Sequence, residues 1–308
     1  MPLSNTLSNM LSNTLSVDVE DYFQTEAMSL IAPGDSWCSF PSRVEANTRA
    51  LFELFAKYDA RATFFFLGWT AERYPQLVRE AHELGHEVAC HSYWHRPVFR
   101  LSPAEFREDT SRAKQVIEDA VGVVVLGYRA PCFSINRSVA WAYDILQELG
   151  FQYDSSLNPV RHAFYGNHKG YRAPYRIAAG LHELPIATWR VLGQNLPVGG
   201  GAYLRILPYW LVSSGVSSIN AKEARPAILY LHPWEIDKEQ PRLQASVISR
   251  ARQYTGLSQM KRKLKRLLQQ FKFGTMYETV YLPLVSQNDG GQGLAYRDHV
   301  SPLSGAVS

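Results

Sequence analysis

Residues 15–21 read Leu-Ser-Val-Asp-Val-Glu-Asp, an apolar alternation that ends in three carboxylates within four positions. Alternation with a period of two is typical of a β-strand. Six further β-branched or aromatic runs follow along the chain: Ala62–Leu67, His86–Cys90, Val123–Tyr128, Phe151–Asp154, His182–Ile186 and Ala227–His232. Helical stretches separate several of them, which implies a parallel sheet with helical crossovers. We therefore predict an α/β fold, a barrel of about seven parallel strands, complete or distorted.

The composition excludes several classes of protein. Of 308 residues, 46% are hydrophobic and 12% aromatic, which rules out a wholly disordered, acidic or collagen-like chain. The formal net charge of +4 is mild for this length and gives little support for a nucleic-acid binder. The sequence contains no run of about 18 apolar residues, the length that would predict a membrane-spanning helix.

The two ends of the chain differ in composition from its middle. Residues 1–14 repeat Leu-Ser-Asn and predict a flexible leader. Residues 15–284 are expected to form a single barrel domain that includes the C-terminal helices. The Gly/Ser/Asn-rich residues 285–308 predict a mobile tail.

Cysteine usage and the start of the chain bear on location. Cys38, Cys90 and Cys132 cannot all pair within one chain, and none lies in a Cys-x-x-Cys motif, so reduced thiols are favoured. The first residues lack a basic region followed by an apolar core, the pattern of a signal peptide. Together these features predict a cytoplasmic protein.

Two segments stand outside the strand and helix alternation. Residues Leu157–Gly180 are long and aperiodic, which is typical of a functional loop. Later, Lys261, Arg262, Lys263, Lys265 and Arg266 crowd one side of a predicted helix. We expect the apolar stripe of this helix to pack on the barrel and its basic face to meet solvent; binding to a membrane surface is the alternative.

Polar side chains gather where five of the predicted strands end. In a parallel barrel, the loops after the C-terminal ends of the strands form the active site. The clusters are Asp18–Asp21, His91–His95, Arg129–Pro131, Asp154–Ser156 and His232–Glu235. We predict that these five clusters form one site.

Several residue types in these clusters suit catalysis. His91 and His95 are four apart, so on one helical turn both could face a cation, and imidazole with carboxylate is a common Zn²⁺ ligand set. Arg129 follows an apolar run and needs a buried partner, for which a carboxylate of the first strand is the natural candidate. His232 at a barrel mouth suits proton transfer near neutral pH. For each histidine, a satisfied core position is the alternative.

The ordered set VDVEDYF, HSYWH, YRAPCFS, YDSS and YLHPWE resembles the five motifs of NodB-homology polysaccharide deacetylases, carbohydrate esterase family 4. More narrowly, it resembles the branch near peptidoglycan deacetylases and cofactor-free allantoinases, and within it the exopolysaccharide deacetylases found with exosortase systems. The resemblance covers roughly Leu15 to Phe273. It implies a distorted (β/α) barrel and a metal-dependent hydrolase that removes N-acetyl groups from N-acetylhexosamine units of a bacterial polysaccharide or its precursor.

The resemblance also implies catalytic roles. Asp18 would be the general base that activates water, and Arg129 would pair with it and orient it. His232 would be the general acid that protonates the leaving amine, with Asp154 tuning it. The backbone N–H of Cys132 would help to form the oxyanion hole.

The implied cofactor is a divalent metal ion, Zn²⁺ first, with Ni²⁺, Co²⁺ and Mn²⁺ as alternatives, held by His91 and His95. The third ligand is open, because the family commonly has two adjacent aspartates where this chain has Asp-Val-Glu-Asp. Period-two geometry keeps Asp18 and Glu20 on one strand face, which favours Glu20. If the strand ends at Asp18, Asp21 could fold back instead.

The implied partner is an N-acetylated saccharide. Five aromatic side chains beside the motifs could stack on sugar rings: Tyr22, Phe23, Trp94, Phe133 and Trp234. A nucleic-acid partner is not expected, since the histidine motif lacks the Cys-x-x-Cys of nucleobase deaminases. Membrane contact and oligomeric state stay open. The alternative functions are a small-amide hydrolase of allantoinase type and a non-catalytic carbohydrate-binding protein.

Overall fold

The computed structural model describes residues 11–160, 170–177 and 180–288. Most of the predicted leader and tail, and part of the predicted loop Leu157–Gly180, lie outside these residues. The first strand, β1 (Asn13–Val19), begins two residues inside the predicted leader, and both of those residues are buried. The last helix, α11 (Leu282–Asn288), runs into the segment predicted as tail.

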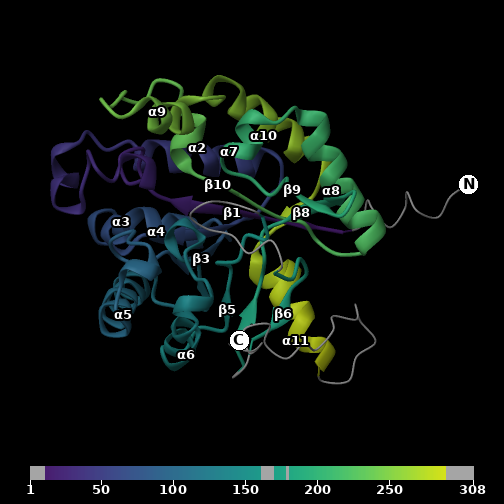
Figure 1. The fold of residues 1–308 in the computed structure, drawn as a ribbon, viewed down its shortest axis with the longest axis horizontal. Helices are drawn as coiled ribbons and strands as arrows, with labels where there is room; N and C mark the ends of the chain where they lie inside the picture. Colours follow the sequence, from purple (N-terminus) through teal and green to yellow (C-terminus); the bar gives the residue numbers. More distant parts are fainter. Residues whose placement is uncertain (1–10, 161–169, 178–179, 289–308) are drawn as a thin grey trace, which may run out of the picture.

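A curled sheet forms the centre of the molecule (Figure 1). Seven parallel strands follow one another in the order β10-β1-β2-β3-β4-β5-β7, which confirms the predicted distorted barrel. Their bounds are β1 (Asn13–Val19), β2 (Thr63–Phe66), β3 (Glu87–Cys90), β4 (Gly127–Tyr128), β5 (Tyr153–Asp154), β7 (His182–Glu183) and β10 (Ile228–Leu231). The two edges approach one another where the Ala187 N–H donates to the Ile228 carbonyl at 2.9 Å.

Four strands were not predicted. β6 (Tyr175–Arg176) pairs antiparallel with β7, and β11 (Phe273–Gly274) pairs with β1. β8 (Thr188–Val191) and β9 (Gln194–Pro197) form a hairpin whose two turn residues, Leu192 and Gly193, both have positive φ. Such turns match the twist of the strands that they join.

The predicted strand Val123–Tyr128 is wrong over most of its length, because only Gly127 and Tyr128 pair as β4. Gly122 ends the preceding helix with a φ of 76°, the left-handed conformation that glycine adopts readily. The residues that follow turn outward, and the side chains of Val123 and Val124 are 43% and 67% exposed. An apolar run therefore forms a connection here, not a strand.

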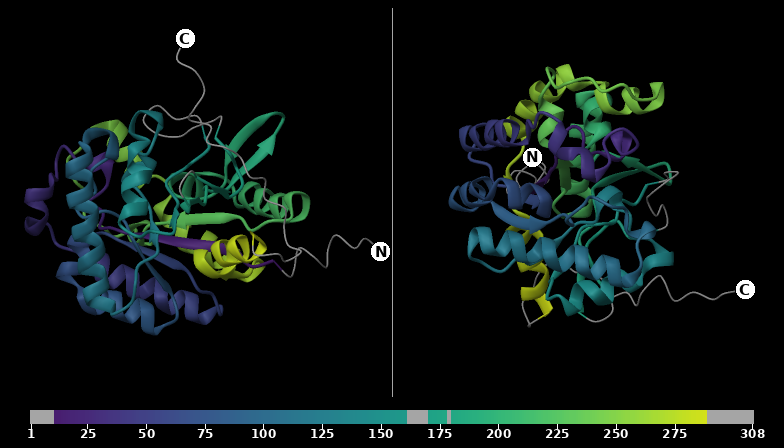
Figure 2. Two further views of the ribbon diagram at one scale, coloured as in Figure 1. Left: turned by 90° about the horizontal axis from the view of Figure 1, so that it is seen from below. Right: turned by 90° about the vertical axis from the view of Figure 1, so that its left-hand side faces the viewer.

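Helices cover the outer face of the sheet (Figure 2). The α-helices are α2 (Val44–Lys57), α3 (Gly68–Arg73), α4 (Pro75–Glu83), α5 (Pro103–Val121), α6 (Trp141–Glu148), α7 (Ala202–Ile206), α8 (Tyr209–Glu223), α9 (Val247–Tyr254), α10 (Leu257–Gln270) and α11. The shorter helical turns are η1 (Glu26–Met28), η2 (Gly34–Ser39), η3 (Val98–Arg100), η4 (Pro131–Phe133), η5 (Arg137–Val139), η7 (Pro233–Ile236) and η8 (Tyr277–Tyr281). α5 begins with the capping box of Ser102 and Glu105.

The alternation of β1 separates two cores. Leu15, Val17 and Val19 pack in the outer core between the sheet and its helices. A second, inner core lies inside the barrel: Phe65, Ala89, Phe133, Tyr153, Leu184, Ile186, Ile228, Tyr230, Met276, Val280, Tyr281 and Leu284. Ser16 and Asp18 alternate with the outer residues and so belong to the inner side. The carboxylate of Asp18 is therefore enclosed by protein and only 2% exposed.

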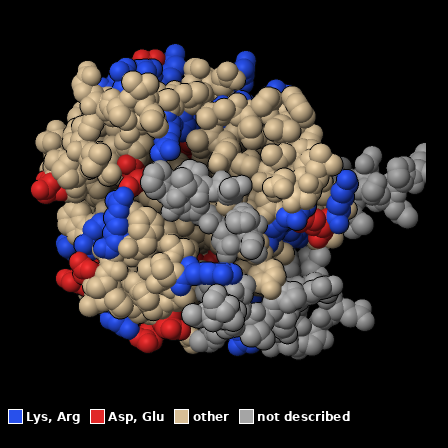
Figure 3. All heavy atoms as spheres, viewed as in Figure 1, with Lys and Arg blue, Asp and Glu red and all other residues tan. Residues whose placement is uncertain are grey.

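The predicted basic helix is α10, and its apolar stripe packs against the core as expected. The expectation that the whole basic face meets solvent is wrong for one residue. Lys263 is buried, and its Nζ donates to the carbonyls of Leu204, Arg205 and Leu207. The other four cations on this face are exposed. On the side of the molecule seen in Figure 3, basic and acidic side chains are interspersed.

No helix within the described residues is both long enough and apolar enough to cross a lipid bilayer.

Candidate active site

The predicted site residues that the structure brings together lie at the C-terminal ends of four parallel strands and just beyond them. Asp18 lies near the end of β1 and Glu20 directly follows that strand, and His91 and His95 follow β3. Arg129 follows β4, and its carbonyl accepts a hydrogen bond from His91. His232, which follows β10, completes the group through contacts with Asp18 and Glu20.

Glu20, His91 and His95 form a compact trio. Their candidate ligand atoms all lie within 4.8 Å of one another, and all three side chains are buried. The two imidazole centroids are 5.3 Å apart. The predicted helical turn between them is wrong: Ser92 and His95 have φ of 63° and 53°, so the segment is an irregular loop that nevertheless brings both rings to one point.

The trio fits a divalent metal ion. His91 Nδ1 lies 2.7 Å from the Arg129 carbonyl, which leaves Nε2 as the nitrogen with an available lone pair. Glu20 Oε2 is buried and accepts no hydrogen bond from the described residues, although His95 Nε2 lies 2.9 Å away. Two imidazoles and a carboxylate suit Zn²⁺ and related ions. A buried carboxylate oxygen without a hydrogen bond, beside two imidazoles, is what a cation would satisfy.

Asp21 does not lie with this trio. Its Oδ2 accepts hydrogen bonds from the Ser42 hydroxyl and from the backbone N–H groups of Arg43 and Val44, at 2.7–3.1 Å. Val44 is the first residue of α2, and Ser42 and Arg43 directly precede it, so Asp21 binds the N-terminus of that helix. Burial raises the pKa of the Asp21 carboxyl, and the same hydrogen bonds oppose that rise.

Asp18 and Arg129 form a fully buried ion pair, with Nη1 2.6 Å from Oδ1. The remaining Arg129 donors reach the Ser16 hydroxyl and the hydroxyl and carbonyl of Ser155, at 2.8–3.1 Å. The guanidinium also lies 4.2 Å from the ring centroid of Phe65. A buried pair is stable when its other donors are satisfied in this way. The prediction gave neither serine a role, although Ser155 lies in the predicted cluster Asp154–Ser156 and Ser16 is two residues from Asp18.

The His232 ring faces two groups of carboxylates. Its Nε2 lies 3.2 Å from Glu20 Oε1 and 3.9 Å from Asp18 Oδ2, and its Nδ1 lies 3.4 Å from Glu235 Oε2. Burial lowers the pKa of His232, but these negative groups outweigh it and raise the pKa to about 9. Burial likewise raises the pKa of Glu20, and the nearby histidines outweigh it and lower the pKa to about 2.

Asp154 is not beside His232. The carboxylates within 4.0 Å of the His232 ring, among the described residues, are Asp18, Glu20 and Glu235. Asp154 accepts from the Ser156 hydroxyl at 2.6 Å and shares a hydrogen bond with buried Glu183. Burial is the main cause that raises the pKa of Asp154 to about 6. The prediction missed Glu183 altogether and gave no role to Glu235, although Glu235 lies in the quoted YLHPWE motif.

The other residues singled out from the motifs divide into two groups. Tyr22 and Phe23 are fully buried, so they are core residues that no sugar can reach. Phe133 and Trp234 are also buried, and Trp234 stacks on His232 with centroids 5.2 Å apart, whereas Trp94 is partly exposed. Cys132 has a φ of 57°, and its thiol, like the other two, is free.

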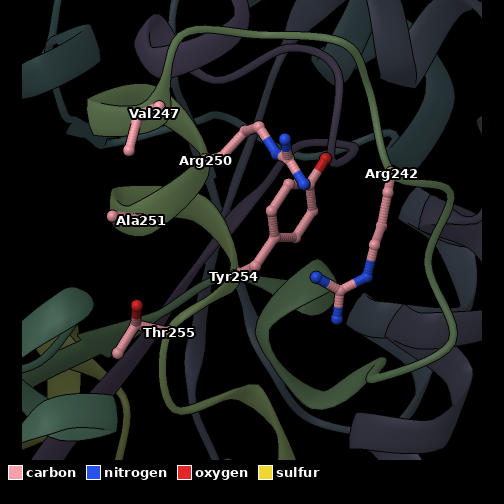
Figure 4. Close-up of a pocket in the computed structure, with 6 residues that line it drawn as sticks. All are labelled: Arg242, Val247, Arg250, Ala251, Tyr254 and Thr255. Atoms are coloured by element: carbon pink, nitrogen blue, oxygen red, sulfur yellow. The ribbon is translucent and has the colours of Figure 1, made fainter.

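A surface hollow of about 470 Å³ lies beside α9, away from the residues described above (Figure 4). Its lining residues are Arg242, Val247, Arg250, Ala251, Tyr254 and Thr255. The Arg242 guanidinium lies over the Tyr254 ring, 4.9 Å from its centroid. None of the predicted catalytic or metal residues lines it.

The parallel half-barrel, with polar groups converging at the C-terminal ends of its strands, places the protein in the class of (β/α) barrel proteins with a candidate active site at that end. Two family models narrow that class. Residues 35–153 match the model described as Polysaccharide deacetylase, and residues 155–281 match a Domain of unknown function, DUF3473. The chain thus contains a polysaccharide deacetylase domain of the NodB-homology type, carbohydrate esterase family 4, followed by a DUF3473 domain, which confirms the resemblance.

Similar proteins agree with this assignment. A peptidoglycan deacetylase of Helicobacter pylori is 28% identical over 113 residues, 37% of this chain and 38% of its own. A bifunctional xylanase/deacetylase of Pseudobutyrivibrio xylanivorans is 26% identical over 108 residues, 35% of this chain and 18% of its own. The chain therefore spans less than half the length of these relatives. A Mycobacterium smegmatis structure assigned as a polysaccharide deacetylase has a TM-score of 0.58 at 18% identity, covering 94% of this chain and 96% of that one, and shares the fold.

Proposed function

We propose that this protein is a metal-dependent hydrolase that removes N-acetyl groups from N-acetylhexosamine units of a bacterial polysaccharide or its precursor. The observation that carries the proposal is the convergence of two sets of groups at one buried point. Glu20, His91 and His95 form the trio that fits a cation, and His232 lies within 3.2 Å of its carboxylate. The Asp18–Arg129 pair lies beside them.

The trio of Glu20, His91 and His95 would hold the ion, for which Zn²⁺ is the first candidate. When bound, a divalent ion polarises the acetamide carbonyl and lowers the pKa of water. The chain's own residues then supply the proton transfers that amide hydrolysis needs.

Asp18 is proposed as the general base. Its Oδ1 accepts from Arg129, which leaves Oδ2 to take a proton from the attacking water. Arg129 fixes the carboxylate, because its remaining donors are held by two serines. His232 is proposed as the general acid. Its Nε2, 3.9 Å from Asp18 Oδ2, would donate a proton to the leaving amine nitrogen.

Acetate release from N-acetylglucosamine oligomers tests the proposal directly. The full chain would be assayed as purified, after dialysis against a chelator, and after separate addition of Zn²⁺, Co²⁺, Ni²⁺ and Mn²⁺. We expect release that disappears with the metal and returns with at least one of these ions. Release that survives complete metal removal would contradict the metal-dependent mechanism. Hydrolysis of allantoin-type amides with no release from any N-acetylated saccharide would overturn the substrate class.

A further inference from the structure

A buried arginine in the second half of the chain connects three segments behind His232. Arg205 lies in α7, and its side chain is 2% exposed. Its Nη atoms donate to the carbonyls of Arg252, Gln253 and Thr255, at the C-terminal end of α9, at 2.6–3.0 Å. Its Nε donates to Glu235 Oε1 at 2.7 Å. All three nitrogens of this guanidinium thus donate hydrogen bonds, so its position is fixed.

Glu235 lies between Arg205 and His232. One of its oxygens, Oε1, accepts from Arg205, and the other, Oε2, accepts the His232 backbone N–H at 3.0 Å. Oε2 also lies 3.4 Å from His232 Nδ1, within ion-pair distance, and Nδ1 has no hydrogen-bond partner among the described residues. The Glu235 carboxylate is completely buried. Its charge is therefore balanced by Arg205 while its second oxygen faces the ring.

The backbone that carries Arg205 is itself held by neighbouring residues. Lys263 of α10 donates to the carbonyl of Arg205 at 2.6 Å and to those of Leu204 and Leu207. Gly256 also packs closely here, because a Cβ there would lie 2.7 Å from the Arg205 carbonyl oxygen. Small shifts of the guanidinium are consequently restrained by packing as well as by hydrogen bonds.

We propose that Glu235, supported by Arg205, is the positioning residue for His232. A 180° turn of the imidazole about its Cβ–Cγ bond would exchange Nδ1 with Cδ2 and Nε2 with Cε1, and a carboxylate beside Nδ1 selects one of the two orientations. Glu235 keeps Nδ1 on its own side and so turns Nε2 toward Asp18 and Glu20, where the leaving amine would be protonated. This inference rests on the proposed function and gives Glu235 the role that the sequence resemblance assigned to Asp154.

A comparison of leaving groups tests the role. An amide needs its nitrogen protonated as it departs, whereas the phenolate of p-nitrophenyl acetate leaves without a proton. We expect Glu235→Gln to lower kcat for N-acetylglucosamine oligomers about 100-fold, with KM changed by less than about twofold. Hydrolysis of p-nitrophenyl acetate should fall by less than about threefold. Equal losses on both substrates would overturn the proposal, since they would mean general damage to the site.

A second test asks whether Glu235 acts through His232. In a His232→Ala background, Glu235→Gln should change kcat by less than about twofold, because residues that act as a unit are not additive. The same fold-loss in both backgrounds would contradict the inference. Arg205→Met should resemble Glu235→Gln in its substrate pattern. Arg250→Met is the matched control: Arg250 is exposed on α9 beside the hollow, and its loss should leave both activities intact (Figure 4).

Nuclear magnetic resonance of nitrogen-15-labelled histidine gives a readout that needs no turnover. The His232 ring nitrogens, assigned by comparison with His232→Ala, should shift in Glu235→Gln and Arg205→Met and stay unchanged in Arg250→Met. Unmoved His232 signals would overturn the positioning role even if wild-type activity is as proposed. A wild-type protein that releases no acetate but shows the shift would contradict the proposed function alone. Should Glu235→Gln not fold, Arg205→Lys carries the same tests, with a smaller expected loss of about tenfold on the amide.

Discussion

The first half of the chain, through β5, places its charged groups by strand geometry, whereas the second half places His232 by contacts between helices. Asp18 and Arg129 each stand at the end of a strand and meet at 2.6 Å. His232 also follows a strand, but its ring faces Glu235, which is held by Arg205, a residue 30 positions away. The register of the sheet fixes the Asp18–Arg129 pair. The orientation of His232 depends instead on Glu235 and Arg205, and both side chains must be in place.

Removing the strand-borne base should have the largest effect. Asp18→Asn is expected to lower kcat about 1,000-fold on both N-acetylglucosamine oligomers and p-nitrophenyl acetate, because both reactions need an activated water. This result contrasts with the amide-selective loss expected at Glu235. Steady-state kinetics on the two substrates measures the difference. Asp35→Asn, at an exposed carboxylate in η2, is the control. A loss confined to the amide would remove the distinction between the two halves.

The neighbouring carboxylates Glu20 and Asp21, which follow β1, should have different functions. Glu20→Gln is expected to weaken Zn²⁺ binding at least about 100-fold, since it removes an anionic ligand from the trio. Asp21→Asn should leave the Zn²⁺ affinity within about threefold and lower the free energy of unfolding by about 1 kcal/mol, because Asp21 binds the N-terminus of α2. Calorimetric titration and chemical denaturation measure both quantities. The reverse pattern would make Asp21 the ligand.

The free energy of unfolding should depend on pH because of His86 in the first half of the chain. His86 is buried against Phe52 and Phe64, and burial lowers its pKa from 6.5 to about 4. The unfolded chain therefore takes up a proton near pH 6.5 that the folded protein resists until about pH 4, so stability falls as the pH falls through this window. The loss amounts to about 3 kcal/mol by pH 4.

Replacing His86 by glutamine isolates this contribution. Denaturation curves of the wild type and His86→Gln would be compared between pH 7 and pH 4. The free energy of unfolding of the wild type should fall more steeply than that of the variant over this range. Parallel curves would show that another group governs the response to acid.

The smallest effect is expected in the second half of the chain, at Lys263, which donates hydrogen bonds to carbonyls in and just after α7. Lys263→Met leaves three buried carbonyls without their ammonium donor and should lower the free energy of unfolding by about 2 kcal/mol. Lys265→Met, on an exposed position of the same helix, should change it by less than about 0.5 kcal/mol. The amide activity of Lys263→Met should fall about threefold, less than at Glu235, because the lysine acts two contacts further away. Equal effects of the two lysines would show that α7 needs no such support.

The sequence predicted the groups that strands carry. The alternation of apolar residues predicted β1. The same period of two predicted that Asp18 and Glu20 lie on one face. The same alternation could not separate Glu20 from Asp21, since the position of Asp21 depends on the N-terminus of α2, more than twenty residues later. The run at Val123 misled because apolar residues predict burial, and a left-handed glycine before it turned the chain outward.

Groups held by side-chain contacts could not be predicted. Arg205 and Lys263 look like surface cations in the sequence, and their burial depends on carbonyls at the ends of other helices. Helical spacing puts Lys263, three residues after Met260 and four before Leu267, beside the apolar stripe, but it does not reveal the carbonyls that the ammonium group binds. Glu235 was within a quoted motif, yet its contact with His232 follows from the turn that begins η7.

The position of β1 has a consequence for synthesis of the protein. β1 pairs on one side with β2 and on the other with β10, whose residues lie more than 210 positions later in the chain. Until Ile228–Leu231 leave the ribosome, the edge of β1 that pairs with β10 stays open, and such an edge can pair with other chains. We therefore expect the nascent protein to depend on a holding factor, or on rapid translation, until its second half has been made.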